Sequence, residues 1–584
     1  MNRLKPTSLL YLRPFISSLA INSILLSVAL LFNHMYFGTN DDRDISNLLA
    51  NVSGQNNGHY ISFLNIVFAK AVSYLYTWTN NSTNWYVLLS IIFSFLALIC
   101  ICELVIRRTS DYWVGLCLAV ILSTWIYKSH YIVFQFTQNA ALYALTGMLL
   151  LLDAVLHKWE KNSAFSCFLG VLFFVLGGLV RFQSLYFTAP YLCLIVGYEA
   201  LFHEDKSRLF TWLRNRWKPL AAIALSVILI LAARFTHLYL YHFIPELNEY
   251  YSTNNLRAEL LDYGLPDYEQ NADKYAALGL TEQDLWLFSK HTCIDRDVYN
   301  RHALETMVAM KESRGTDYSV RNLTLSAIPK TISCIISDGR YLFLFGICGA
   351  GFLFFLACTS RRRFLLVLSF LALPLGMMWY FVSVDRMPYR IWYSIVVPAL
   401  VMLHYFCAIS YHPSSENARK LTRFIHVMGL SLLVLVSVAT TANCVRRTIE
   451  DDAGQITDSY EKILNFAEEH SDVLVLLDRP TVTPLTYAST ISPLTCLERG
   501  SHANICYQGG WLCWTPGNLC VLQNFDTDNP YRSIGEGMEA YLIDSVSPDQ
   551  KLAFIKRHYN ERVAMEQVGV VEGTEIGIYR FFIP

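Results

Sequence analysis

A series of long apolar runs over the first 443 residues constrains this chain more than any other feature. A membrane-spanning helix needs about 20 mostly apolar residues, and eleven runs reach or approach that length. They begin at Phe15, Trp85, Tyr112, Tyr131, Ala164, Gln183, Leu220, Tyr341, Phe364, Ile391 and Phe424. Charged residues make up only 16% of the chain, too few for an ordinary soluble globule. We therefore expect a mainly α, polytopic membrane bundle of about 11 transmembrane helices.

The basic residues predict the orientation, because Lys and Arg gather in cytoplasmic loops. Every second connection is basic, counting from an inner N-terminus. These connections carry Arg3, Lys5 and Arg13; Arg107 and Arg108; Lys158 and Lys161; five cations from Lys206 to Lys218; Arg361 to Arg363; and Arg419, Lys420 and Arg423. Arg446 and Arg447 fall on the outer side, but long domains translocate regardless of such charges. We expect a cell-membrane protein with a cytoplasmic N-terminus and an extracytoplasmic C-terminus.

The sequence argues against a cleaved signal peptide and against a nucleic-acid partner. The N-terminal apolar run continues to Phe37 without a small-residue cleavage motif, so it is interpreted as a retained helix and not as a signal peptide. The net charge is -1, and no basic block exceeds the triplet at Arg361. A nucleic-acid partner is therefore not expected.

The topology divides the chain into four parts. Residues 1–249 form a seven-helix membrane module that includes an outer loop at 38–84, and residues 250–340 form a large helical outer loop. Residues 341–443 form a four-helix membrane module. Residues 444–584 form an extracytoplasmic domain.

The first outer loop begins with acidic residues and continues as two amphipathic stretches. Asp41, Asp42 and Asp44 are followed by apolar periodicity over 45–52 and 60–76, with a Gly-rich turn between. Asn40 or Asp41 is expected to cap the first stretch as a helix. Neither stretch can span a bilayer, so we expect two helices at the membrane surface. This places the acids just beyond the first membrane helix.

The other outer segments have their own local signals. A capping box at Thr281 to Asp284 begins a helix in the second segment. The C-terminal segment predicts a helix over 458–469 and strands over 472–478, 518–523 and 577–582, a pattern typical of a small α/β domain. We find no dinucleotide, P-loop, serine-hydrolase or zinc-protease motif. No cofactor is required, and a divalent cation has no motif behind it.

The cysteines of the C-terminal segment are unusually crowded. Cys496, Cys506, Cys513 and Cys520 lie within 25 residues, which in an oxidising compartment predicts one or two local disulfides. Zinc is the alternative, although no C-x-x-C pair is present.

Cations gather near the predicted outer membrane boundary, where charge is costly and therefore informative. Lys128, Arg181, Arg386 and Arg390 all lie there. Arg181 occupies a connection so short that its guanidinium must find an anion or a lipid headgroup. These cations could hold a lipid phosphate while a carboxylate accepts an acceptor's proton. The alternative is that they only snorkel to ordinary headgroups.

Several motifs resemble the GT-C class of membrane glycosyltransferases. An acidic pair follows the first membrane helix, and seven helices precede a second outer loop. More narrowly, Asn40-Asp41-Asp42, Gly58-His59, Trp85-Tyr86 and the run from Arg257 to Leu280 resemble a family of uncharacterised bacterial multi-pass membrane proteins. The resemblance covers most of the first 390 residues.

What the resemblance implies is inverting transfer of a sugar from a polyprenyl-phosphate donor to a cell-envelope glycan or other acceptor. Asp41 or Asp42 would then be the catalytic base, with Asp41 favoured, and Asp44→Asn is expected to be mild. His59, Lys128, Arg181, Arg386 and Arg390 would bind substrate. A transporter or flippase is the main alternative, although we see no internal repeat. A non-catalytic envelope assembly factor is the third reading, for which the loop acids would be dispensable.

Overall fold

The computed structural model describes residues 6–54, 58–157, 163–201, 209–312, 327–336, 361–384, 386–410, 457–487 and 489–584, with a few positions between 431 and 439. The protein is mainly helical. It divides into two compact units, which are described separately below. The first unit comprises Met1–Met35, Leu89–Arg234 and Tyr318–Asp451, and the second comprises Tyr36–Leu88, Phe235–Asp317 and Asp452–Pro584.

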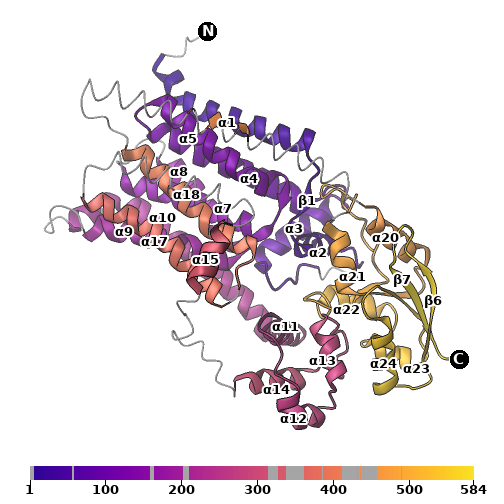
Figure 1. The fold of residues 1–584 in the computed structure, drawn as a ribbon. Coiled ribbons are helices and arrows are strands. Elements are labelled where there is room, and N and C mark those ends of the chain that lie inside the picture. Colours follow the sequence, from indigo (N-terminus) through magenta and orange to yellow (C-terminus); the bar gives the residue numbers. More distant parts are fainter. Residues whose placement is uncertain are drawn as a thin grey trace. The chain divides into compact units, whose positions relative to one another are not determined.

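The described part of the first unit consists mostly of long apolar helices (Figure 1). They are α1 (Pro6–Phe32), α4 (Trp85–Arg108), α5 (Tyr112–Ile126), α6 (Lys128–Tyr131), α7 (Phe136–Leu156), α8 (Ser163–Val180), η1 (Phe182–Ser184), α9 (Leu185–Leu201), α10 (Leu209–Phe243), α15 (Ala327–Ile336), α17 (Arg361–Ser383) and α18 (Tyr389–Ser410), with the short strand β2 (Val133–Phe134). Helices α4 and α10 each continue into the second unit.

Helix α7 is the centre of this unit, and nearly all of its residues are buried. It packs closely against α8 through glycines on both helices. A Cβ at Gly147 would lie 2.2 Å from the backbone nitrogen of Phe174, and one at Gly177 would lie 2.6 Å from that of Ala144. Small residues allow membrane helices to approach in this way, since packing drives their association.

Six helices are long and apolar enough to cross a membrane among the described residues. They lie at Leu12–Phe32, Trp85–Arg108, Phe136–Leu156, Ser163–Val180, Trp212–Phe243 and Tyr389–Ile409, and shorter apolar helices lie at Tyr112–Ile126 and Leu368–Ser383. The run expected from Gln183 corresponds to α9, which has 17 residues. The run expected from Tyr341 lies outside the described residues, as do all but a few positions of the run from Phe424. The described residues thus contain several helices that could span a membrane, and the count of eleven stays a prediction.

The second unit collects segments close to the three that the sequence analysis places outside the membrane. Its first segment holds β1 (Tyr36–Phe37), α2 (Asn40–Leu49) and α3 (Ile66–Trp78). Both expected amphipathic helices are therefore present, although each is shifted from its predicted bounds. Helix α2 begins earlier than expected, with Thr39 in the N-cap position instead of Asn40 or Asp41.

The second segment of this unit is helical. It contains α11 (Pro245–Tyr263), η3 (Glu269–Asn271), α12 (Ala272–Ala277), α13 (Glu282–Ser289) and α14 (Arg301–Glu312). The predicted capping box is confirmed at α13, where Thr281 and Asp284 bond each other's backbone N–H groups. This segment and the C-terminal segment share one hydrophobic core, which includes Tyr250, Leu287 and Leu542.

The C-terminal segment contains a five-stranded sheet in the order β4-β3-β5-β7-β6. Its elements are α20 (Ser459–Glu469), β3 (Leu474–Leu477), α21 (Arg479–Tyr487), β4 (Ile505–Tyr507), α22 (Pro516–Gln523), α23 (Pro530–Glu536), β5 (Ala540–Asp544), α24 (Pro548–His558), β6 (Ala564–Val570) and β7 (Gly577–Phe582). Strand β3 pairs in parallel with β4 and β5, whereas β7 pairs antiparallel with β5 and β6.

Three of the four elements predicted here are confirmed, namely the helix near 458–469 and the strands near 472–478 and 577–582. The predicted strand over 518–523 is wrong, because these residues belong to helix α22. The side chain of Thr515 accepts a hydrogen bond from the Asn518 N–H, and Pro516 occupies the first turn. Both features start a helix.

The crowded cysteines also require a correction. Cys496, Cys506, Cys513 and Cys520 are all free thiols in the structure, so the predicted local disulfides are not present. Closeness in sequence did not bring their thiols together, because Cys506 lies on a strand, Cys520 within a helix and Cys513 in the loop between them. The described residues contain no group of three or more side chains arranged to hold a metal ion.

Candidate functional site

The acidic residues of the first loop occupy the start of helix α2. Asp41 and Asp42 both lie in its first turn, where the helix dipole favours negative charge. The structure gives the neighbouring carboxylates of this turn different surroundings, and those surroundings separate their roles.

Asp42 is fully buried. Its Oδ2 accepts a hydrogen bond of 2.7 Å from the hydroxyl of Thr39, and its Oδ1 accepts one of 2.8 Å from the hydroxyl of Tyr86. A buried carboxylate with a donor on each oxygen is held in place by its neighbours. Asp42 therefore stabilises the loop and is poorly placed to meet a substrate.

Asp41 is only half-buried. Its Oδ1 accepts a hydrogen bond of 2.9 Å from the indole N–H of Trp511, a buried residue of the C-terminal segment. The ring of Trp511 packs edge-on against Phe63, with centroids 4.7 Å apart. This carboxylate is thus oriented by a rigid donor and remains partly accessible, which is the combination that a general base requires.

Asp44 is buried and forms an ion pair with Arg479. Burial acts to lower the pKa of Arg479, but the carboxylate of Asp44 overrides this effect and raises it. Arg479 therefore stays charged. Removing either partner would take this ion pair from the other buried charge. Asp44→Asn, whose expected effect on turnover is mild, should therefore still cost stability.

Further contacts fix the first loop to the C-terminal segment. The side chain of Asn84 donates a 2.8 Å hydrogen bond to the carbonyl of Pro493. The backbone of His502 donates to the carbonyl of Val52 at 2.9 Å. Arg43 donates to the carbonyl of Ile491. The C-terminal segment, whose role the sequence left open, therefore holds the acidic loop from several sides.

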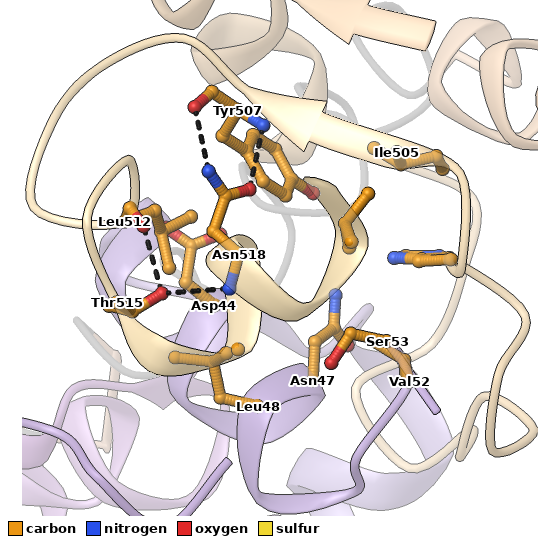
Figure 2. A pocket seen from close by; sticks show the side chains of 13 residues that line it. Asp44, Asn47, Leu48, Val52, Ser53, Ile505, Tyr507, Leu512, Thr515 and Asn518 are labelled. Atoms are coloured by element: carbon orange, nitrogen blue, oxygen red, sulfur yellow. Dashed lines mark hydrogen bonds between the residues drawn. The ribbon is translucent and has the colours of Figure 1, made fainter. Parts of the chain in front are cut away.

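A small cavity lies beneath α2, next to these contacts. It has a volume of about 30 Å³, and its lining includes Asp44, Asn47, His502 and Asn518. Figure 2 shows Asn518 bonded to the backbone of Tyr507, with Asp44, Asn47 and Ser53 on the side of α2. Asn47 Nδ2 and His502 Nε2 have no hydrogen-bond partner among the described residues. A cavity of this size suits one or two waters and is far too small for a sugar.

His59 lies in the loop that follows α2. Its ring packs against that of Tyr60, with centroids 4.2 Å apart. Burial, and then the charge of Lys70, lower the pKa of His59, so the imidazole is neutral at pH 7. The hydrogen bonds resolved in the described part of the chain do not connect it to Asp41. If His59 binds substrate as predicted, it would do so as a neutral imidazole.

Gly58, which precedes this histidine, marks a close approach of two backbones. A Cβ at this position would lie 1.5 Å from the carbonyl oxygen of Leu48. Its N–H also donates to the side chain of Asn51 at 3.1 Å. Any larger residue would displace the end of α2.

In the first unit, three predicted cations lie on segments that surround the first turn of α7. Arg181 stacks over the ring of Phe136 at 4.8 Å. The segment of Lys128 is held through His130, whose two ring nitrogens bond Asn139 of α7 and Tyr393 of α18 at 2.7 and 2.8 Å. Tyr393 lies one turn after Arg390. The three segments that carry these cations, which are far apart in the sequence, therefore all pack near the start of α7.

The fourth cation, Arg386, follows the end of α17 beside an apolar groove. Its backbone N–H donates to the carbonyl of Phe381 at 2.8 Å, and the ring of Phe381 packs against Phe187 of α9. The groove has a volume of about 740 Å³ and runs between α9 and α17. Its lining includes Tyr186, Phe187, Pro190, Gly376, Tyr380 and Phe381. A groove of this character suits an apolar chain.

Sequence reasoning missed Trp511 and Arg479, which contact Asp41 and Asp44 across more than 430 positions. No local pattern could have revealed these contacts.

The comparisons with known proteins do not identify the chain: no protein-family model matches it, and no curated protein matches it.

Proposed function

We propose that this protein is a membrane glycosyltransferase of GT-C type, which transfers a sugar from a polyprenyl-phosphate donor to a glycan or other acceptor on the outer face of the cell membrane. The carrying observation is Asp41, a half-buried carboxylate in the first turn of α2 whose Oδ1 is held by the Trp511 indole. The proposal includes about 11 transmembrane helices, an inner N-terminus and an outer C-terminus.

The proposed reaction is a single displacement at the anomeric carbon of the sugar. Asp41 accepts the proton of the acceptor hydroxyl as its oxygen attacks that carbon. The new C–O bond forms while the bond from carbon to the phosphate oxygen breaks, so the configuration inverts. The leaving group is the polyprenyl phosphate, which departs with the bonding electron pair.

From their positions in the sequence, we also propose that cations of the first unit bind the phosphate of the donor. Arg181, Arg390 and Lys128 are carried by segments around the start of α7. A guanidinium can bind two phosphate oxygens at once, and charge stabilisation of a leaving group is among the largest catalytic effects. The apolar groove between α9 and α17 is suited to the polyprenyl chain, with Arg386 beside it.

The first test identifies the product in cells. The cell envelope is analysed by mass spectrometry with and without the gene, and a missing sugar would point to the transferase and its acceptor together. An unchanged envelope glycan profile would contradict the proposal and favour the transporter or the assembly factor.

The second test substitutes the base. Asp41→Asn keeps the shape of the side chain but cannot accept the proton, so glycosylation should fall on the order of 100-fold or more at normal expression. Asp472→Asn, at an exposed acid of the same unit, is the matched control and should retain activity. Full glycosylation in the double variant Asp41→Asn, Asp42→Asn would exclude catalysis by this pair.

A substitution at Arg181 tests whether this arginine binds the phosphate of the donor. Arg181→Ala should weaken donor binding more than stability, and Arg181→Lys should rescue only partly, because an ammonium cannot form the bidentate contact. Binding is measured with a polyprenyl-phosphate sugar on the purified protein. Unchanged binding in Arg181→Ala would reduce this arginine to a headgroup anchor.

A further inference from the structure

Two cysteines from distant segments meet inside the second unit. The Sγ atoms of Cys293 and Cys513 are 3.4 Å apart, although the residues are separated by 220 positions. Both residues are fully buried. Neither has a role in the proposed sugar transfer, so the pair calls for a separate explanation.

The backbone holds these two thiols together independently of the sulfur atoms. The N–H of Cys293 donates to the carbonyl of Gln508 at 2.9 Å. Gly509 lies so close to His291 that a Cβ there would be 1.3 Å from the histidine carbonyl oxygen. The two chain segments are therefore in fixed register.

We propose that Cys293 and Cys513 form a disulfide in the mature protein. The bond would join the helical segment of α11 to α14 with the C-terminal segment, two positions after Trp511. A disulfide requires a sulfur separation of about 2.05 Å, and thiols held in contact can reach it by small side-chain rotations. Such a bond is expected where the compartment is oxidising, as on the outer side of a membrane.

The oxidant is a thiol–disulfide oxidoreductase of that compartment, acting before the two segments close around the sulfurs. The thiolate of Cys293 attacks the disulfide of the oxidant and forms a mixed disulfide. The thiolate of Cys513 then attacks the Sγ of Cys293, which forms the new bond and releases the oxidant as a dithiol. Two protons and two electrons leave the pair, and the electrons reside in the reduced oxidant.

In the packed structure the two thiols have different surroundings. Burial works to raise the pKa of its thiol, but the hydrogen bond from Cys513 and the charge of Arg257 together lower it. Burial raises the pKa of Cys513. After packing, Cys293 is therefore the more acidic thiol of the pair.

Cys506 provides the matched control. It is also fully buried in the C-terminal segment, and its sulfur accepts a hydrogen bond of 3.5 Å from the side-chain amide of Asn518. It should remain a free thiol in the same molecule.

The test uses the full-length protein extracted from membranes without reductant. Free thiols are blocked with N-ethylmaleimide in denaturant, and disulfides are then reduced and labelled with a second maleimide. We expect peptide mapping to find the second label on Cys293 and Cys513, and the first label on Cys506. The single variants Cys293→Ser and Cys513→Ser should each return the remaining partner to the first label.

Finding Cys293 and Cys513 with the first label in the wild-type protein would overturn the proposal. The wild-type measurement decides by itself if a variant fails to fold. The result is also independent of the proposed sugar transfer, because it is read from the peptides and not from activity.

Discussion

Two groups of carboxylates in the second unit differ in how completely they are enclosed. At the ends of the parallel strands β3 and β5, Asp478 and Asp544 are fully buried and each lies 2.5 Å from the ammonium of Lys551. The hydroxyl of Thr481 and the backbone N–H of Ser547 bond their other oxygens. At the start of α2, Asp42 and Asp44 are enclosed in a similar way, but Asp41 is half-buried.

The difference shows how to separate structural from functional acids. A buried carboxylate loses its hydrating water, so donors in the protein must replace that water at both oxygens. Once those partners are present, there is no room for a substrate. Asp41 has a firm partner without full enclosure, so proton transfer to it needs no rearrangement of the core. The following predictions test this distinction, from the largest expected effect to the smallest.

Removing Lys551 should have the largest effect. Lys551→Ala leaves two buried carboxylates without their cation, which we expect to lower the free energy of unfolding by about 3–5 kcal/mol. The loss is measured by thermal unfolding of the purified protein in detergent. Lys556→Ala, on the same helix α24 but partly exposed, should change stability little. Equal stability of both variants would mean that the sheet-edge cluster is not structural.

Asp44→Asn should have the next largest effect on stability. It removes the ion pair between Asp44 and the buried guanidinium of Arg479, and we expect the free energy of unfolding to fall by about 3 kcal/mol. Asp41→Asn, three positions earlier, should leave the melting temperature unchanged while it abolishes activity. If Asp41→Asn were the more destabilising of the two, the division between structural and functional acids in α2 would be wrong.

Local signals account for what the sequence predicted. Apolar runs, amphipathic periodicity and the capping box at Thr281 depend on neighbouring residues, and they located α2, α3, α13, α20, β3 and β7. The acidic pair was found in the same way. The misassigned segment at 518–523 is apolar enough for a strand, but Thr515 and Pro516 start a helix there.

Long-range contacts account for what the sequence could not predict. The partner of Asp41 lies 470 positions away and that of Asp44 lies 435 positions away. Cys513 faces Cys293 instead of its neighbours in sequence. Such pairings follow from the packing of whole segments, which no local pattern records. The sequence offered little physical ground for choosing between Asp41 and Asp42, because the choice depends on how deeply each side chain is buried.

The α2 region should also respond to mild acid through His502, which lines the cavity beside Asp44. Burial, with a smaller effect of Arg43, lowers the pKa of His502 to about 4, against about 6.5 in an unfolded chain. Between these values only the unfolded chain binds the proton, so stability is full above about pH 6.5 and is lost as the pH falls toward 4. At pH 5 the loss is about 2 kcal/mol. The melting temperature should therefore drop less between pH 7 and pH 5 in His502→Gln than in the wild type, and equal drops would refute a buried neutral imidazole.

The smallest effect is expected at Trp511, which orients the proposed base without touching the reacting atoms. Trp511→Phe keeps an aromatic ring against Phe63 but removes the N–H that holds Asp41 Oδ1. A hydrogen bond to a charged group contributes about 1.5 kcal/mol or more, so glycosylation should fall roughly tenfold while the melting temperature stays within a few degrees. Trp511→Ala, which also removes the ring contact, should lose stability as well. The comparison of the two variants separates orientation from packing: an active Trp511→Phe beside an inactive, unstable Trp511→Ala would mean that the indole only fills space, and that Asp41 needs no partner to serve as the base.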